Sequence, residues 1–353
     1  MNNQPIRIGV IGAGANTTAK HIPLLQQIPG VEIVGVCNRT RESSQRVADR
    51  FGIPRVYDQW EDAIADPDTD AIVIGTWPYL HCAITLAALG AGKHVLTEAR
   101  MAMNASEAHA MHSAAQARPH LIAQVVPSPI TLAVDATLQR MLTEGWLGEL
   151  LLIDVRMRSA FLDREAPLHW RQDVELSGMN IMMLGIYYEA IMRWAGTASR
   201  VTAHGKVFAK TRKDAAGVER TVKVPEHLEV SADMECGAQL HLQQSAVTPF
   251  LQGEGISLFG DQGILRFHDG RLFGGRKGDS EPTEIEIPDH ERSEWRVEEE
   301  FINAIRGKEE VKLTTFADGV KYMEFTEAVH RSLSTGQSVS LPLKFKDEVT
   351  DLE

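Results

Sequence analysis

The 353-residue sequence is poor in cysteine, in long apolar runs and in clusters of basic residues. Its three cysteines, Cys37, Cys82 and Cys236, are scattered and odd in number. This pattern predicts neither a disulfide framework nor a thiolate metal site, and it fits a reducing, cytoplasmic location. No apolar stretch approaches the roughly 20 residues of a membrane-spanning helix. We therefore expect no metal centre and no membrane partner.

Basic residues are fewer than acidic ones: the sequence has 36 lysines and arginines and 48 aspartates and glutamates, so its net charge is −12. An acidic chain without a dense basic run argues against nucleic-acid and anionic-membrane partners. The first five residues lead straight into an apolar run, so we expect no signal peptide. The hydrophobic share of 43% and the length indicate a globular protein of two domains.

The most informative motif is a glycine turn directly after the apolar run Ile6–Ile11. Gly12 permits a tight turn, Gly14 allows the backbone to approach a phosphate, and the helix that follows directs free N–H groups at the phosphate. Thr17 stands where the usual dinucleotide motif has its third glycine. A strand, a glycine turn and a helix in this order favour binding of a dinucleotide pyrophosphate.

Up to about residue 125, apolar runs alternate with helical stretches of 10 to 13 residues. This alternation predicts a parallel, doubly wound Rossmann sheet in residues 1–124, with the cofactor at the carboxyl ends of its strands. The strands that we expect are 6–11, 31–37, 71–76, 94–97 and 121–126, and the helices are 18–27, 41–51, 79–91 and 106–117.

The pattern changes in residues 125–353, where apolar and polar residues alternate over several short runs. Alternation of this kind predicts a C-terminal α+β domain with a large, mainly antiparallel open sheet, in which one face is covered and the other is polar or covered by a partner, so that self-association is expected. We expect strands near 151–157, 228–234, 240–242, 256–259 and 264–267, and helices over 130–143, 179–195, 297–306 and 316–334.

Three local strings together resemble the glucose–fructose oxidoreductase, inositol dehydrogenase and MocA-like (Gfo/Idh/MocA) family. They are Gly75-Thr76-Trp77-Pro78, Ala91-Gly92-Lys93-His94-Val95-Leu96-Thr97-Glu98 and Glu300-Phe301-Ile302-Asn303-Ala304-Ile305-Arg306-Gly307. The resemblance covers essentially the whole chain. It implies an NAD(P)-dependent oxidoreductase that acts on CH–OH groups of sugars, cyclitols and related polyols. It also implies that residues 125–353 bind the substrate and that the chain often forms a homodimer or homotetramer joined through the open sheet.

The chain departs from this family where the usual catalytic residues stand. The family commonly follows the equivalent of Glu98 with a lysine, and here the residue is Ala99. The family's aspartate and histidine in the long helix align with Met183 and Tyr187. The resemblance therefore supports the fold and the cofactor better than it supports the usual proton-transfer residues.

Tyr187 and His169 are the candidates for proton transfer. A tyrosine has an ordinary pKa near 10, so Tyr187 needs a nearby cation to act as a base, or it acts better as the acid in carbonyl reduction. Histidine titrates near neutral pH. A packed structural aromatic and a hydrogen-bonding structural histidine are the alternatives for these two positions. Candidates for substrate contact are Arg100, Trp170, Arg171, Asn180 and Glu189.

The end of the second expected strand bears on the choice of cofactor. NAD enzymes usually carry an acidic residue there for the ribose hydroxyls. Here Asn38 and Arg39 remove the repulsion against a 2′-phosphate and offer a cation, which favours NADP over NAD. The candidate cofactor-binding residues are Gly12, Gly14, Ala15, Asn16, Thr17, Asn38, Arg39, Thr76, Trp77, His81 and Glu98.

These observations predict an NAD(P)-dependent oxidoreductase for a sugar, a polyol or cyclitol, or a sugar-derived carbonyl. The missing lysine keeps an alternative open, namely a protein that retains the cofactor without net hydride transfer, as a sensor or an NAD-assisted lyase or glycosidase. A Rossmann-like methyltransferase also uses a Gly-x-Gly turn, but it explains neither the Glu98 string nor the second domain.

Overall fold

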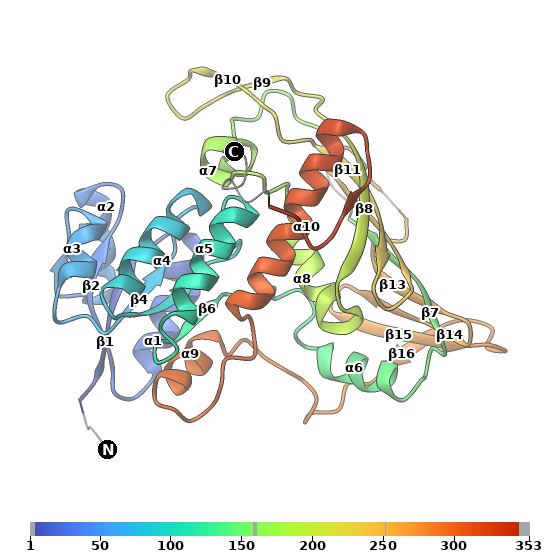
Figure 1. Cartoon of the computed structure of the whole chain (residues 1–353), viewed down its shortest axis with the longest axis horizontal. Coiled ribbons are helices and arrows are strands. Elements are labelled where there is room, and N and C mark those ends of the chain that lie inside the picture. Colours follow the sequence, from blue (N-terminus) through green and yellow to red (C-terminus); the bar gives the residue numbers. More distant parts are fainter. Residues whose placement is uncertain (1–3, 158–160, 251, 346–353) are drawn as a thin grey trace, which may run out of the picture. The chain divides into compact units, whose positions relative to one another are not determined.

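The structure is a computed structural model that describes residues 4–157, 161–250 and 252–345. It contains two compact units (Figure 1). The first comprises Met1–Pro129, Val174–Gly178 and Trp295–Met323, and the second comprises Ile130–Asp173, Met179–Glu294 and Glu324–Glu353. Among the described residues no helix combines the length and the hydropathy that a membrane crossing requires.

The first unit is built on a parallel sheet of six strands in the order β3-β2-β1-β4-β5-β6. The strand order reverses between β1 and β4, so that a crevice opens at the carboxyl ends of those strands, as in Rossmann folds. The strands are β1 (Ile6–Ile11), β2 (Val31–Cys37), β3 (Arg55–Val56), β4 (Ala71–Ile74), β5 (His94–Thr97) and β6 (Ala123–Val125).

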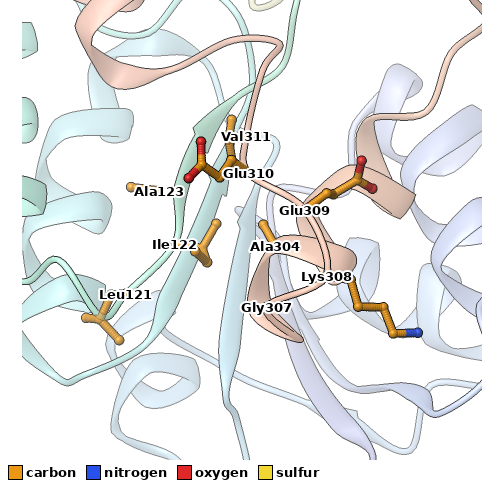
Figure 2. A pocket seen from close by; sticks show the side chains of 9 residues that line it. All are labelled: Leu121, Ile122, Ala123, Ala304, Gly307, Lys308, Glu309, Glu310 and Val311. Carbon is orange, nitrogen blue, oxygen red and sulfur yellow. The ribbon is translucent and has the colours of Figure 1, made fainter.

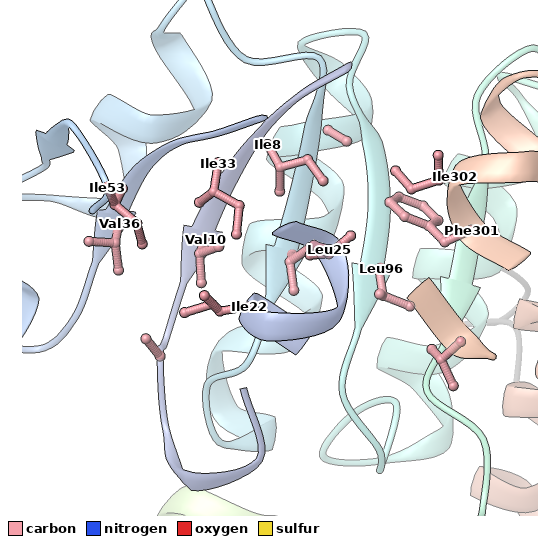
Figure 3. Close-up of a cluster of buried hydrophobic side chains, with 14 of the residues drawn as sticks. Ile8, Val10, Ile22, Leu25, Ile33, Val36, Ile53, Leu96, Phe301 and Ile302 are labelled. Carbon is pink, nitrogen blue, oxygen red and sulfur yellow. The ribbon is translucent and has the colours of Figure 1, made fainter. Parts of the chain in front are cut away.

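Helices pack on both faces of this sheet. Figure 3 shows Ile22 and Leu25 of α1 beside Ile8 and Val10 of β1 on one face, and Phe301 of α9, which belongs to the same buried cluster, near Leu96 of β5. On the other face, a Cβ added to Gly9 would meet Ala63 of α3. The helical segments are η1 (Thr17–His21), α1 (Ile22–Gln27), α2 (Arg41–Phe51), α3 (Trp60–Ala65), η2 (Pro78–Leu80), α4 (His81–Gly90), α5 (Ala105–Gln116), α7 (Val174–Ser177) and α9 (Val297–Ile305).

The second unit is built on a nine-stranded sheet in the order β16-β15-β14-β13-β7-β12-β11-β8-β17. All of its pairs are antiparallel except β7 with β12. The expected mainly antiparallel sheet is thereby confirmed. Its strands are β7 (Leu150–Arg156), β8 (Ala198–Lys206), β11 (His227–Met234), β12 (Gln239–Ser245), β13 (Gly255–Gly260), β14 (Gly263–His268), β15 (Arg271–Arg276), β16 (Thr283–Ile285) and β17 (Val339–Ser340).

The helical segments of this unit are α6 (Asp135–Thr143), η3 (Trp170–Gln172) and α8 (Leu184–Ala195), and β9 (Thr211–Lys213) and β10 (Glu219–Thr221) form a separate two-stranded sheet. The helix α10 (Phe316–Thr335) belongs to the first unit up to Met323 and to the second from Glu324. One face of the large sheet is buried, as the alternation of Leu228, Val230 and Ala232 in β11 requires. Tyr188 of α8 stacks on Phe325 of α10 with ring centroids 3.6 Å apart.

Two helices begin five residues later than the sequence predicts, and one helical segment differs in type. The helix expected from Met179 begins at Leu184, because Met182 has a positive φ of 44° that a right-handed helix does not accommodate. The helix expected from Ile130 begins at Asp135. The segment after the glycine turn opens as a π-helix, in which Ile22 N–H donates to Thr17 O.

Candidate active site

The glycine turn follows β1 and is fixed by backbone hydrogen bonds. Gly12 has a φ of 86°, donates its N–H to Cys37 O at 2.8 Å and accepts from Gly14 N–H at 2.9 Å. A Cβ at Gly12 would lie 2.5 Å from the amide nitrogen of Thr76, so no other residue fits. A Cβ at Gly14 would meet only Gly75 O, at 3.7 Å. The turn thus packs tightly at Gly12 and stays open at Gly14.

Thr17, in the place of the third glycine, faces inward and is buried. Its hydroxyl lies 3.2 Å from Gly12 O and donates to it. Ala15 and Asn16, by contrast, are exposed at the outer side of the turn. The threonine therefore ties the first helical turn back to the glycine turn.

A cavity of about 490 Å³ opens in front of this turn. It is lined by the last residues of β1 and β2 and by the segments that follow β1, β2, β3 and β4. The lining includes Gly12, Ala13, Gly14, Asn38, Arg39, Thr40, Ser43, Arg46, Asp58, Thr76, Trp77 and Tyr79. Six of the expected cofactor-binding residues line this cavity and are brought together by the fold, namely Gly12, Gly14, Asn38, Arg39, Thr76 and Trp77.

Asn38 fixes the shape of one wall of the cavity. Its side-chain oxygen accepts from Ala13 N–H at 2.6 Å, and its side-chain amide donates to Ser43 Oγ at 2.9 Å. Arg39 lies over the Trp77 ring, with its guanidinium carbon 6.0 Å from the ring centroid. Arg46, one turn into α2, adds a second cation to the lining.

His81 is buried below the cavity. Its ring nitrogens lie 2.9 Å from Thr76 O and 3.0 Å from Arg100 O. Burial lowers the pKa of His81, although both carbonyl contacts favour the charged form. His81 thus fixes the backbone on two sides of the site, and Arg100 is itself 1% exposed.

Glu98 stands directly after β5, at the same edge of the sheet as the glycine turn. Its Oε1 accepts from the side-chain amide of Asn16 and lies 3.0 Å from His21 Nε2. Burial favours the neutral acid, but the hydrogen bond and the charge of His21 outweigh it and lower the pKa of Glu98. The two expected cofactor residues Asn16 and Glu98 are therefore in direct contact.

In the second unit, His169, Trp170 and Arg171 form one short cluster at η3. Arg171 N–H donates to His169 Nδ1 at 3.3 Å, and the Arg171 guanidinium carbon lies 4.3 Å from the Trp170 ring centroid. Burial and the charge of Arg171 lower the pKa of His169, so its imidazole is neutral at pH 7.

A buried ion pair supports the segment that leads to this cluster. Arg212 donates to Asp163 O at 3.0 Å and to Ala166 O at 2.8 Å, and it also contacts Glu226 Oε1 at 3.1 Å. Its side chain is 4% exposed. Arg212 and Glu226 thus hold the chain just before His169 in a fixed path.

Tyr187 is half-buried on α8. Burial raises the pKa of its hydroxyl, and the charge of Glu254 raises it further. A raised pKa disfavours the phenolate, so this environment suits a proton donor and opposes the role of a general base at neutral pH. Glu189 of the same helix and Asn180, which precedes it, are both buried.

A second cavity of about 540 Å³ lies in the first unit, at the amino end of β6 (Figure 2). It is lined by Leu121–Ala123 and by Gly307–Val311 after α9. Glu309 in its wall already accepts from Asn303 at 2.8 Å and from Arg296 at 3.2 Å. Because ligands of open parallel sheets bind at the carboxyl edge, the cavity at the glycine turn is the candidate site.

Several groups were not predicted from the sequence: Ser43, Arg46 and Tyr79, which line the cavity, and His21 and Glu298, which are bonded to each other beside Glu98. Ser43 and Arg46 could have been found from their place in the first turns of the helix after β2. Glu298 gave no signal, since it lies 277 residues from His21, its partner.

A parallel sheet with a glycine turn and a crevice after β1 defines a dinucleotide-binding protein of the Rossmann type. Residues 6–125 match the oxidoreductase family with an NAD-binding Rossmann fold, and residues 136–266 match the C-terminal domain of the Gfo/Idh/MocA proteins. The chain belongs to the Gfo/Idh/MocA family of NAD(P)-dependent oxidoreductases.

Curated relatives include the trans-1,2-dihydrobenzene-1,2-diol dehydrogenases of Bos taurus and Oryctolagus cuniculus. The bovine enzyme is 29% identical over 221 residues, which are 62% of this chain and 63% of the enzyme. The rabbit enzyme is 29% identical over 217 residues, or 61% of this chain and 63% of the enzyme. The matched part therefore spans less than two thirds of these relatives.

Solved structures share the fold over nearly the whole chain. Levoglucosan dehydrogenase in complex with NADH and levoglucosan superposes with a TM-score of 0.82 at 20% identity, covering 96% of this chain and 100% of that chain. The aldose-aldose oxidoreductase of Caulobacter crescentus superposes with a TM-score of 0.78 at 18% identity, covering 96% and 100%.

Proposed function

We propose that this protein is an NADP-preferring oxidoreductase that interconverts a secondary alcohol of a sugar, polyol, cyclitol or related diol with its carbonyl. The observation that carries the proposal is the cavity at the glycine turn, whose wall after β2 holds Asn38, Arg39 and Arg46. A bound nicotinamide would supply or accept the hydride.

The residues of the first unit fit a dinucleotide. Gly14 offers an open backbone for the pyrophosphate, flanked by Ala15 and Asn16 and anchored by Gly12 and Thr17. At the other end, Arg39 and Arg46 offer cations for a 2′-phosphate and Trp77 offers a ring face. Asp58 also lines the cavity, but Arg41 neutralises it at 2.5 Å. Thr76, His81 and Glu98 complete the edge.

Residues of the second unit supply proton transfer and substrate contact in this proposal. Tyr187 donates the proton in carbonyl reduction, as its raised pKa favours. His169, neutral at pH 7, accepts or relays a proton. Trp170 and Arg171 bind hydroxyl or acidic groups of the substrate. We assign further substrate contacts to Asn180 and Glu189 of this unit and to Arg100 of the first unit.

The substrate class is supported by the relatives, whose names place diols, levoglucosan and aldoses among their substrates. A single experiment tests cofactor and reaction together. NADPH and NADH are titrated by fluorescence, and polyols and sugar carbonyls are then screened with the tighter cofactor. Clearly tighter binding of NADPH is expected; equal or tighter binding of NADH would contradict the 2′-phosphate assignment.

Replacement of the family's usual lysine by Ala99 favours a second candidate, a cofactor-retaining protein without net hydride transfer. Such a protein would convert substrate with no net change in NADPH absorbance. A stoichiometric change in absorbance with turnover excludes it.

We further propose that the large sheet mediates a homodimer or homotetramer. On its open face, Leu152 of β7 pairs with Phe259 of β13 beside a polar cluster in which Asp154 contacts His241 and Arg156, each at 2.8 Å. Light scattering tests this: a mass of one chain at all concentrations would contradict it.

A further inference from the structure

A buried histidine with two carboxylate partners lies directly below the glycine turn. His21 is 0% exposed and ends the π-helical segment that follows the turn. Its Nδ1 lies 2.5 Å from Glu298 Oε1 and its Nε2 lies 3.0 Å from Glu98 Oε1. A neutral imidazole carries one N–H, so only the imidazolium donates to both carboxylates.

The three side chains come from distant parts of the chain. Glu98 follows β5, His21 follows the glycine turn, and Glu298 stands in the first turn of α9. A carboxylate in the first turn is stabilised by the helix dipole. Glu298 is 2% exposed and also accepts from Trp295 Nε1 at 2.9 Å. Glu298 is therefore held from both sides and serves as a fixed anchor.

The positive charge of His21 is buried next to two carboxylates of opposite charge, which offset the cost of its burial. The charged groups around His21 are Glu98, Glu298 and Lys20, whose ammonium lies 3.9 Å from the Trp295 ring centroid, and His81 acts on Glu98 from α4. Burial opposes the charge on His21, but its bonds to Glu298 and Glu98 outweigh it and raise its pKa to about 9.

We propose that His21 is a positioning residue of the dinucleotide site: anchored by Glu298, it holds the Glu98 carboxylate against Asn16 and thereby sets the shape of the glycine turn. This inference rests on the proposed function. Asn16 is the link, since its side-chain amide contacts Glu98 Oε1 and lies 3.3 Å from His21 Nε2. Glu298 and His21 thus act on the cofactor through Glu98 and Asn16.

The matched variants are Glu298→Gln and Glu300→Gln, which make the same substitution at two buried positions of α9. Glu300 accepts hydrogen bonds from the N–H groups of Lys312 and Leu313, and neither of these residues is a partner of His21. Glu298→Gln is expected to weaken NADPH binding on the order of tenfold, the scale of a lost charge-assisted hydrogen bond. Glu300→Gln is expected to leave NADPH binding unchanged.

The second measurement does not depend on cofactor. The His21 signal is followed by NMR in histidine-labelled protein and is assigned by its loss in His21→Gln. In the wild type it should titrate near 9, and in Glu298→Gln it should titrate at a lower pH. In the folded protein His21 is charged below its pKa of about 9 and loses this charge as the pH rises through that value, so the NADPH affinity of the wild type should fall over the same rise.

Two results overturn the proposal in a protein that still binds NADPH: His21 titrates near its ordinary 6.5, or the two glutamine variants bind NADPH equally well. Failure of the wild type to bind either NADPH or NADH is a different result, because it overturns the proposed function itself and removes the positioning role with it.

Discussion

The glycine turn of the first unit and the helix α8 of the second place candidate chemistry in different ways. At the turn, Gly12 and Gly14 contribute backbone atoms, and neighbouring residues along the chain build the surface. On α8, the chemistry depends on one side chain, Tyr187, while the adjacent Tyr188 packs in the core. A site built from backbone atoms tolerates few substitutions, and its motif can be recognised in the sequence. A site built from side chains can change through single substitutions while the fold stays the same.

The largest effect that we expect comes from Gly12→Ala. Its positive φ and the 2.5 Å approach of a Cβ to Thr76 predict a loss of about 2–4 kcal/mol in stability, together with loss of NADPH binding. Gly52→Ala is the control, because Gly52 also has a positive φ, of 66°, but no atom lies within 4 Å of its added Cβ. Thermal unfolding and NADPH titration check both. Equal losses in the two variants would show that the close packing at Gly12 is unimportant.

Tyr187→Phe tests the side-chain site on α8. Removing a proton donor should lower kcat by roughly 100-fold or more, with little change in stability. Tyr188→Phe is the control, since Tyr188 OH accepts from Ala198 N–H at 2.7 Å and its loss should cost about 1 kcal/mol of stability without loss of activity. Steady-state kinetics and thermal unfolding separate the two. A Tyr187→Phe enzyme with native kcat would remove this residue from the mechanism.

The smallest effect concerns the choice between the two cofactors. Arg39→Ala should weaken NADPH binding by about tenfold and leave NADH binding nearly unchanged, because only NADPH carries the 2′-phosphate. Arg50→Ala is the control: Arg50 lies near the end of α2, the helix that follows Arg39, and its guanidinium packs on Phe51 and does not line the cavity. If both variants weaken NADPH and NADH alike, the arginine supplies general charge and gives no preference.

Sequence patterns predicted most of the elements and fewer of their boundaries. The strands Ile6–Ile11 and Val31–Cys37 and the helix Arg41–Phe51 have the predicted bounds, since an apolar run or a capped amphipathic helix carries its own limits. The start of α8 was predicted five residues early. Apolar periodicity continues through Met182, and only the backbone shows the positive φ there.

The family, the parallel sheet and the glycine turn can be recognised in the amino-acid sequence, because these features depend on residues that are neighbours along the chain. Which charged side chains meet depends instead on the folded structure. The approach of Glu298 to His21 and the support of the His169 segment by Arg212 join residues far apart in sequence. Such pairs cannot be predicted from a local sequence pattern, because the two partners meet only in the folded chain. A buried charged group without its partner would destabilise the fold.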